Sequence, residues 1–477
     1  MDKQMRIPLY EALREHVNKR PVSFHVPGHK YGSIPPTESP ELFEQILKID
    51  ATELTGLDDL HSPEGAILEA ELLLADVYQT KRSFFLVGGS TVGNLAMVMA
   101  ACTEGSTVLV QRNCHKSVFN ALKLAKVRPI FLEPEVNQEW KVAAGVSIET
   151  LAQALKFYSK VRAIILTYPN YYGLTYDLEA IIHLAHLHHI PILVDEAHGA
   201  HFIYDSFPKS ALQLGADLVV HSAHKTLPAM TMGSYLHVKS DLVDLEMVKG
   251  YLETFQSSSP SYPIMASLDI ARNYIATYGK RDYSFLQMEI NRFKTKLASV
   301  VAIKVLDASE FQIDSLKLTI QSRCGLTGFE LQRRFEEFGV YTELADPYNV
   351  LFILPLLKEG QWYPFDEAAE KIKSALNGLP VCKVIEECYM GGQKITELAV
   401  AYHEMSRLAV NDTAIEKAAG AVCAETIIPY PPGIPLLVKG ERITEVKLAQ
   451  LHHLSQTGTR FQGGSLLKNG RLKTFSI

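Results

Sequence analysis

The chain has 477 residues, of which 47% are hydrophobic and 21% charged, a composition typical of a globular protein with a sizeable core. At roughly 150 residues per domain, this length suggests about three domains. The formal net charge of -6, without a long basic run, argues against nucleic acid as a main partner. Apolar stretches are strand-sized, so none is expected to cross a membrane. Six cysteines without Cys-x-x-Cys spacing are expected to be reduced thiols in the cytoplasm, not a zinc site: Cys102, Cys114, Cys324, Cys382, Cys388 and Cys423.

Alternating apolar runs and helical patterns dominate the first 300 residues. Seven strands are predicted at 83–87, 107–110, 129–132, 163–166, 191–194, 217–220 and 234–238. Helical patterns lie between most of them, for example at 116–126, 148–159 and 177–189. This alternation predicts an α/β fold with a mainly parallel sheet and helices on both faces.

The predicted elements divide the chain into four parts. Residues 1–75 form an N-terminal segment rich in proline and turn signals, and residues 76–300 form the large α/β domain. Strands at 303–306, 316–320 and 350–354 with a helix at 327–338 predict a smaller α+β domain over 301–364. The remainder, 365–477, is expected to be a helical region with a proline-rich stretch.

The first motif is a glycine-rich turn after the strand at 83–87. Residues 88–94 read GGSTVGN, and the apolar run that follows predicts a helix. Glycines allow close approach to an anion, and the first N–H groups of a helix are unpaired donors suited to phosphate. Such a turn is also an ordinary connection between a strand and a helix, so by itself it is weak evidence.

A carboxylate and an amine each follow a later strand. Asp195 comes directly after the apolar run at 191–194, and Lys225 follows the run at 216–220 within SAHKT. Open α/β sheets bind ligands at the carboxyl ends of their strands. Pyridoxal phosphate needs a lysine for a Schiff base and an acid that keeps the pyridine nitrogen protonated. Alone, Asp195 could be a helix cap and Lys225 a solvated loop residue, but the turn, the acid and the lysine in this order predict that cofactor.

Four segments carry a resemblance to a known family, the Orn/Lys/Arg decarboxylases, which are fold-type-I pyridoxal-phosphate enzymes. They are residues 24–30 (FHVPGHK), 112–117 (RNCHKS), 222–226 (SAHKT) and 429–435 (PYPPGIP) with Gly440-Glu441. Within this family the chain resembles the short branch, because the large inducible members carry a Trp where His198 stands. The resemblance implies a fold-type-I large domain and a smaller α+β C-terminal part.

The resemblance also implies roles for individual residues. Lys225 would form the Schiff base and later transfer a proton, and Asp195 would pair with the ring nitrogen. His115 would stack on the ring, although it could instead cap the helix that begins at 116, and His198 would reach the ring oxygen or the substrate carboxylate. Phosphate would be bound by Ser90, Thr91, Ser222 and His224. The segment Ser257-Ser258-Ser259 resembles one that reaches the neighbouring subunit's phosphate, which implies at least a homodimer, although the three serines could equally form a flexible loop.

The substrate is expected to be a basic amino acid, and arginine, converted to agmatine for polyamine synthesis, is the prediction of the short-branch resemblance. Lysine and ornithine stay open. An acidic group must read the distal cation, and the candidates are Asp58, Asp59, Glu343 and Glu441. An aminotransferase, with Arg323 or Arg407 on the α-carboxylate, is the alternative enzyme. A non-catalytic binding protein is less favoured, because such a protein is expected to lose Lys225 or Asp195, and both are present.

Overall fold

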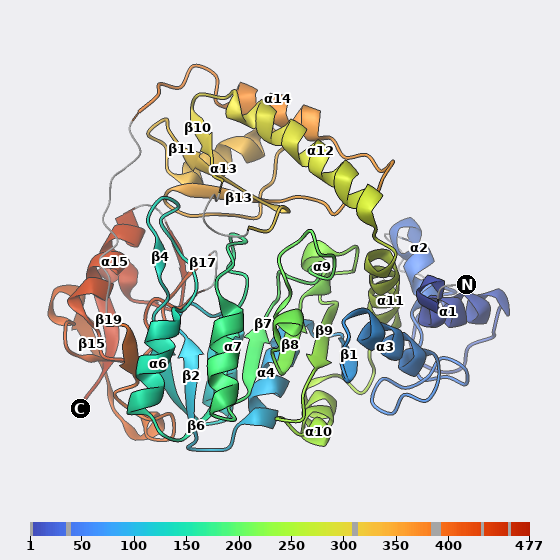
Figure 1. The fold of residues 1–477 in the computed structure, drawn as a ribbon, viewed down its shortest axis with the longest axis horizontal. Helices are drawn as coiled ribbons and strands as arrows, with labels where there is room; N and C mark the ends of the chain where they lie inside the picture. Colours follow the sequence, from blue (N-terminus) through green and yellow to red (C-terminus); the bar gives the residue numbers. More distant parts are fainter. Residues whose placement is uncertain (1–2, 35–39, 308–312, 383–392, 431–433, 457–458) are drawn as a thin grey trace. The chain divides into compact units, whose positions relative to one another are not determined.

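The computed structural model describes residues 3–34, 40–307, 313–382, 393–430, 434–456 and 459–477 (Figure 1). Part of the C-terminal motif, 431–433, and Cys388 lie outside the described residues. The chain forms two compact units, each built from two stretches of sequence. Unit 1 contains Met1–Ala101 and Pro191–Gly279, and unit 2 contains Cys102–Ile190 and Lys280–Ile477.

Unit 1 is built on four strands in the order β1-β9-β8-β7. Strand β7 runs parallel to β8, whereas β9 is antiparallel to both β8 and β1. The strands are nearly continuous apolar runs because both faces are buried. Their bounds are β1 (Arg82–Leu86), β7 (Ile192–Asp195), β8 (Leu218–His221) and β9 (Ser234–Val238).

Eight α-helices lie in the part of unit 1 that the structure describes. Helix α4 packs against β8 and β9, and α3 packs against β1. The expected turn at 88–94 is shorter than predicted, because α4 already begins at Gly89, so Ser90 and Thr91 lie in its first turn. The helices are α1 (Pro8–Asn18), α2 (Pro40–Ile49), α3 (Ala66–Val77), α4 (Gly89–Ala101), α8 (Ala211–Leu214), α9 (Ala223–Thr226), α10 (Leu245–Phe255) and α11 (Tyr262–Ala276).

Unit 2 contains a second group of four strands in the order β6-β2-β3-β14. Strands β6, β2 and β3 are parallel, and β14 is antiparallel to β3. Helices α6 and α7 lie side by side over this group (Figure 1). The bounds are β2 (Thr107–Gln111), β3 (Arg128–Leu132), β6 (Val161–Thr167), β14 (Ile395–Glu397), α5 (Lys116–Leu124), α6 (Ile148–Phe157) and α7 (Leu178–Leu187).

A smaller α+β subassembly of unit 2 follows the long helix α12 (Lys280–Ala298). Its antiparallel sheet has the order β10-β11-β13-β12, and α12 packs beside α14. The predicted strands and helix at 303–354 are therefore confirmed to within a few residues. The elements are β10 (Ile303–Val305), β11 (Lys317–Ser322), β12 (Leu344–Ala345), β13 (Asn349–Ile353), α13 (Gly328–Glu337) and α14 (Phe365–Ala375).

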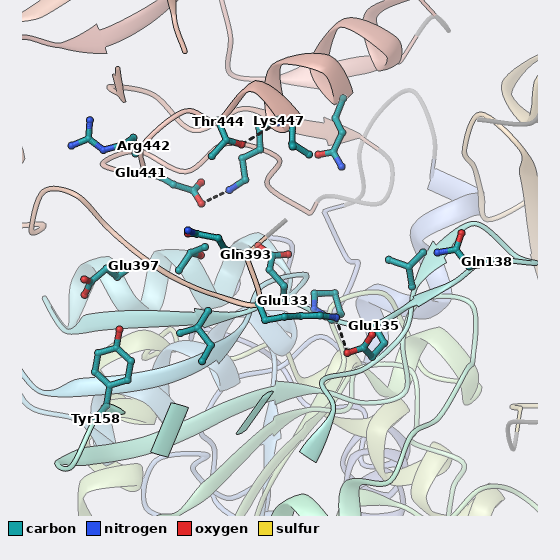
Figure 2. Close-up of a pocket in the computed structure, with 17 residues that line it drawn as sticks. Glu133, Glu135, Gln138, Tyr158, Gln393, Glu397, Glu441, Arg442, Thr444 and Lys447 are labelled. Atoms are coloured by element: carbon teal, nitrogen blue, oxygen red, sulfur yellow. Dashed lines mark hydrogen bonds and ion pairs between the residues drawn. The ribbon is translucent and has the colours of Figure 1, made fainter. Parts of the chain in front are cut away.

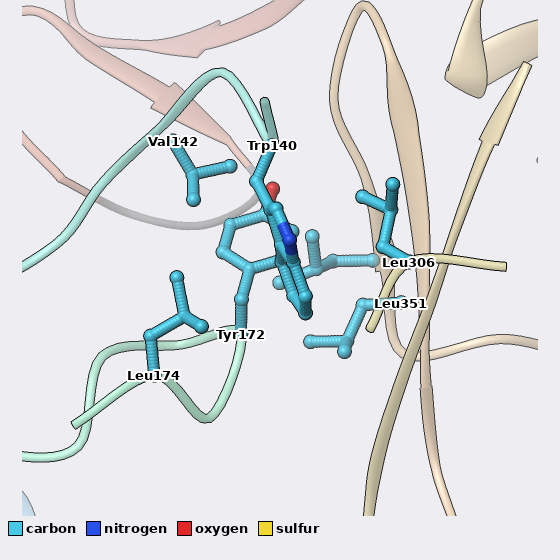
Figure 3. Packing of buried hydrophobic residues seen from close by; sticks show 7 residues of the cluster. Trp140, Val142, Tyr172, Leu174, Leu306 and Leu351 are labelled. Atoms are coloured by element: carbon cyan, nitrogen blue, oxygen red, sulfur yellow. The ribbon is translucent and has the colours of Figure 1, made fainter. Parts of the chain in front are cut away.

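A buried apolar cluster connects this small sheet to two loops of the same unit. Figure 3 shows Trp140 beside Tyr172, with Leu306 and Leu351 on one side and Val142 and Leu174 on the other. The short hairpin of β4 (Val136–Asn137) and β5 (Val142–Ala143) carries Trp140 in its turn. Trp140 is only 1% exposed, so residues on both sides of position 300 share one core.

The C-terminal region contains helices, as predicted, but also short antiparallel strands that the sequence pattern did not predict. Strands β15 and β19, about sixty residues apart in sequence, pair antiparallel, and β16 adds to β19. Such pairing depends on distant partners, which a local pattern cannot reveal. The elements are β15 (Val410–Ala414), β16 (Val422–Cys423), β17 (Ile428–Tyr430), β18 (Arg460–Gln462), β19 (Arg471–Phe475) and α15 (Glu445–Gln456).

Among the described residues, no helix combines the length and apolar character needed to span a bilayer.

Candidate active site

Most of the predicted site residues lie in unit 1, where three chain segments meet beyond the carboxyl ends of parallel strands. Asp195 is the last residue of β7, and Ser222 follows β8 directly and precedes α9. Ser222 Oγ donates to Ser90 Oγ over 2.8 Å, which connects the lysine segment to the first turn of α4. The ligand crevice of open α/β sheets lies at this end of the strands.

Asp195 is 4% exposed, and its carboxylate is held from two sides. Asn94 Nδ2 donates to Oδ2 over 2.9 Å, and the Ala197 N–H donates to Oδ1 over 3.2 Å. A carboxylate offers about four lone-pair positions. Two donors therefore orient Asp195 and leave acceptor capacity for a further N–H, such as that of a protonated pyridine ring.

Lys225 lies within hydrogen-bonding distance of His198. The Lys225 Nζ to His198 Nε2 distance is 3.1 Å, and His198 is buried whereas Lys225 is half-buried. His224, the neighbour of Lys225, has its Nδ1 2.9 Å from the carbonyl oxygen of Gly233. Because a carbonyl oxygen only accepts hydrogen bonds, His224 Nδ1 carries a proton and donates it to Gly233. The hydrogen bond fixes the orientation of the His224 ring.

The start of α4 has the geometry of an anion cradle. Gly89 has φ +77°, and its N–H donates to the carbonyl oxygen of Met232 over 2.9 Å. A Cβ at Gly93 would meet Val220 Cγ2 at 2.4 Å, so only glycine allows α4 to approach β8 this closely. The start of α4, whose first N–H groups have no partner within the helix, thus lies at the end of the sheet beside Ser222, which contacts Ser90.

His115 belongs to unit 2, where it is the N-cap of α5. Its side chain accepts from the Ser117 N–H over 3.3 Å, and its Nδ1 is 2.8 Å from Ser117 Oγ. The capping role that the sequence left open is therefore present. Stacking on a cofactor ring stays a prediction, and the cap would hold the imidazole plane fixed for it.

The serine segment 257–259 is exposed in the single chain. The Ser257 carbonyl oxygen lies 2.9 Å from His61 Nε2, and the Ser259 N–H donates to Ser257 Oγ over 3.2 Å. These contacts order the backbone of the loop but leave the side chains of Ser258 and Ser259 at the surface.

Asp58, one of the four acidic candidates for substrate recognition, is occupied by structural contacts. Asp58 accepts from backbone N–H groups around the start of α3, namely those of Asp59, Glu64, Gly65, Ile67 and Leu68. Asp59 accepts from the His61 N–H over 2.8 Å, and Glu343 is exposed in unit 2.

Glu441 lies in a buried ion cluster of unit 2. Its Oε2 is 3.1 Å from Arg112 Nη2, and its Oε1 pairs with Lys447, which Figure 2 shows facing it. Burial by itself would raise the pKa of Glu441, but the two cations lower it below its usual value. Nearby, burial outweighs Arg112 and raises the pKa of Glu133. Both acids line a pocket of about 850 Å³.

Several residues with contacts to the site were not assigned roles from sequence. Asn94 lies four positions after Ser90, a spacing that places both on one face of α4. Met232 supplies the carbonyl oxygen that fixes Gly89, and Glu196 and His221 contact each other beneath the strand ends. The i,i+4 spacing could have revealed Asn94, whereas the other contacts join distant segments.

Comparisons with known proteins identify the family. The model for "Orn/Lys/Arg decarboxylase, major domain" matches residues 7–314, and that for "Orn/Lys/Arg decarboxylase, C-terminal domain" matches 384–464. The chain is 44% identical to the uncharacterized protein YaaO of Bacillus subtilis (strain 168), covering 99% of both chains. It is 32% identical to the arginine decarboxylase of the same organism, covering 96% of both. The structure of the Escherichia coli constitutive lysine decarboxylase matches with TM-score 0.78 at 21% identity, covering 99% of this chain and 82% of that one.

The chain therefore belongs to the Orn/Lys/Arg decarboxylase family. It is a pyridoxal-phosphate-dependent amino acid decarboxylase, and the expected fold-type-I α/β architecture with a smaller C-terminal part is confirmed. The residues of unit 1 fit the cofactor that the family implies, because a buried acid with spare acceptor capacity, a half-buried lysine and a glycine-opened helix start are all present.

Proposed function

We propose that the enzyme decarboxylates L-arginine to agmatine, as a step in polyamine synthesis. The observation that carries this proposal is the 32% identity over 96% of the chain to a protein named arginine decarboxylase. The Escherichia coli constitutive lysine decarboxylase is 26% identical, and the match covers 75% of that protein. Lysine is therefore the second candidate, and ornithine the third.

The cofactor proposed for the site is pyridoxal 5'-phosphate, which supplies an electron sink when bound. We assign to Asp195 the role of accepting a hydrogen bond from the protonated ring nitrogen, because Asn94 and the Ala197 N–H hold its carboxylate in place. Ser90, Thr91, Ser222 and His224 are assigned to the phosphate. Lys225 would hold the cofactor and then deliver a proton to the α-carbon as the substrate carboxyl group leaves as carbon dioxide.

His198 is assigned to the same reacting face as Lys225, since their nitrogens are 3.1 Å apart. In this position His198 can accept a hydrogen bond from the Lys225 ammonium, or donate one to the substrate carboxylate or the ring oxygen. His115 is proposed to stack on the ring. The substrate's distal cation would be read by an acid other than Asp58 or Glu441, because structural partners occupy both carboxylates.

The enzyme is further proposed to act as a homodimer in the cytoplasm. Ser258 and Ser259 are exposed in the single chain, which supports the proposal because the segment is available to contact a second subunit.

One assay tests both the reaction class and the substrate. The purified protein is incubated with pyridoxal phosphate and L-arginine, L-lysine or L-ornithine, and carbon dioxide and the amine product are quantified. We expect agmatine and carbon dioxide in equal amounts, without a 2-oxo acid, and a preference for arginine of about tenfold or more in kcat/KM. Cadaverine or putrescine as the main product would overturn the choice of arginine. Absence of carbon dioxide with all three would contradict the proposed reaction.

An aminotransferase remains the contrasting enzyme class, but nothing in the structure favours it. Both arginines considered for an α-carboxylate clamp, Arg323 and Arg407, are exposed in unit 2. Family membership favours decarboxylation.

A further inference from the structure

A chain of hydrogen bonds runs through the interior of unit 1 and crosses all four of its strands. Glu196 Oε2 is 2.7 Å from His221 Nε2, and His221 Nδ1 is 3.1 Å from His237 Nε2. His237 Nδ1 is in turn 2.7 Å from Ser83 Oγ. The chain thus passes from the end of β7 through β8 and β9 to β1. All four residues are 0% exposed.

Glu196 is the acceptor end of this chain. Besides His221, its carboxylate accepts from Ser210 Oγ over 3.1 Å and from the Ala211 N–H over 2.8 Å. Three donors compensate the desolvation of a fully buried acid. Because a carboxylate only accepts hydrogen bonds, its partners must present protons to it.

This requirement sets the direction of the whole chain. If His221 donates through Nε2 and is uncharged, its Nδ1 must accept from His237 Nε2, and His237 Nδ1 must accept from the Ser83 hydroxyl. Burial and the neighbouring His221 lower the pKa of His237 well below its usual value, which agrees with an uncharged ring. Donors and acceptors then match one to one from the serine to the carboxylate, with both rings in the Nε2–H tautomer.

Two members of this hydrogen-bond chain lie in the segments that carry the proposed cofactor residues. Glu196 is the residue after Asp195, and His221 is the residue before Ser222. The Glu196–His221 contact therefore fixes the carboxyl ends of β7 and β8 relative to each other. At the opposite ends of the same strands, Asp217 accepts from the Ile192 N–H over 2.7 Å. Two buried carboxylates thus connect this strand pair, one at each end.

We propose that Glu196, acting through His221, is a positioning residue that holds Asp195 and Lys225 in the register that the cofactor requires. The proposal rests on the cofactor roles of Asp195 and Lys225 in the proposed function. Neither Glu196 nor His221 needs to touch the cofactor. Glu196 acts through its neighbour Asp195, and His221 acts through the segment after it, which contains Lys225.

Glu196→Gln is the variant that tests the direction of the chain. Its amide oxygen can keep the Ala211 N–H, and its NH₂ group then faces His221 Nε2, which must accept. The single ring proton of His221 must then lie on Nδ1, which donates to His237 Nε2. Because His237 Nε2 now accepts, the ring proton of His237 must lie on its Nδ1. We expect ¹⁵N NMR of histidine-labelled protein, assigned with a His237→Asn variant, to show both rings switching from the Nε2–H to the Nδ1–H tautomer. Ser83→Ala, at the far end, should keep the native tautomers.

Asp217→Asn is the matched control, because it alters a buried carboxylate at the other end of the same strands. The dissociation constant of pyridoxal phosphate is measured by fluorescence for the native protein and both variants, and urea unfolding gives their stabilities. We expect Glu196→Gln to weaken cofactor binding roughly tenfold, the size typical when a group that orients a ligand-binding residue is altered. Asp217→Asn should lose stability while its cofactor affinity stays within about twofold of the native value.

Unchanged tautomers in Glu196→Gln, a doubly protonated His221 in the native protein, or equal losses of cofactor affinity in the two variants would each overturn the proposal. These results are distinguishable from a failure of the proposed reaction. A native protein that binds pyridoxal phosphate but releases no amine from any of the three amino acids would contradict the reaction alone.

Discussion

Lys225 is the residue on which the proposed chemistry depends most directly. We expect Lys225→Ala to abolish the yellow absorbance of the protein with pyridoxal phosphate, because no other amine is proposed to attach it. Borohydride treatment followed by peptide mass spectrometry should find the label on Lys225 in the native protein and none at the active site in the variant. Lys239→Ala is the control, since Lys239 belongs to the same unit and its Nζ donates to the backbone carbonyl of Gln79. A borohydride-reducible adduct persisting in Lys225→Ala would refute the assignment.

Asp195 is the second test at the scale of single residues. Asp195→Ala should leave the fold largely intact and reduce kcat by about a hundredfold or more, because the ring nitrogen would lose the charge that stabilises its proton. Circular dichroism and steady-state kinetics measure the two effects. Asn94→Ala removes one of the two donors that orient Asp195, so we expect a smaller loss, about tenfold. Near-native turnover in Asp195→Ala would show that the carboxylate is only structural.

Among the elements, helix α3 shows how a candidate substrate acid can have a structural role. Asp58, at φ +71°, accepts several backbone N–H groups at the start of α3, which otherwise lack partners inside the helix. Burial alone would raise the pKa of Asp58, but these N–H groups lower it. The carboxylate therefore stabilises the start of the helix from outside the N-cap position, which Gly65 occupies.

We expect Asp58→Ala to lower the free energy of unfolding by about 1 to 2 kcal/mol at pH 7, the cost typical of a lost cap. Because the folded pKa is lowered, this contribution is present above the unfolded pKa of about 3.9 and is lost as the pH falls through the folded value. The difference between native protein and variant, followed by urea unfolding from pH 7 to pH 2, should shrink toward the acid end. KM for arginine should stay near native. A large rise in KM without loss of stability would instead indicate that Asp58 binds substrate.

For the whole molecule, the proposed homodimer is the property that a single chain cannot display. If Ser258 reaches the phosphate site of a second subunit, a Lys225→Ala variant and a Ser258→Ala variant should complement each other. A mixed dimer contains one site with both native residues, so partial activity should return after subunit exchange, up to about a quarter of the native value for random pairing. Each variant treated alone through the same exchange is the control. Full activity in a monomer at assay concentration, shown by light scattering, would exclude a shared site.

The division of the chain is also a property of the whole molecule. The four-part division at 75, 300 and 364 stays a prediction. The two compact units divide the chain differently, because the chain leaves unit 1 after Ala101 and returns to it at Pro191. Reasoning from sequence assumes that segments close together in the chain share a hydrophobic core. In this protein Trp140 and Leu351, which are far apart in the chain, share one.

The sequence by itself determined the strands, the order of turn, acid and lysine, and the family. Strands β1, β2, β3, β6, β7, β8 and β9 were all predicted within about two residues of their observed bounds, because strands buried on both faces are short continuous apolar runs. Asp195 and Lys225 were found because Asp195 comes at the end of one such run and Lys225 a few residues after another. These signals are local, so a single sequence contains them.

Only the tertiary structure decided which side chains meet. Asn94 and Asp195 are 101 positions apart in the chain, Ser83 and His237 are 154 apart, and Arg112 and Glu441 are 329 apart. Nothing local distinguishes a buried partner of this kind from a solvated residue, since the distinction is made by desolvation and by the geometry of donors and acceptors after folding. Glu441 and Asp58 looked equally available in the sequence for binding a substrate. Folding supplied each with internal partners, because a carboxylate removed from water must be paired.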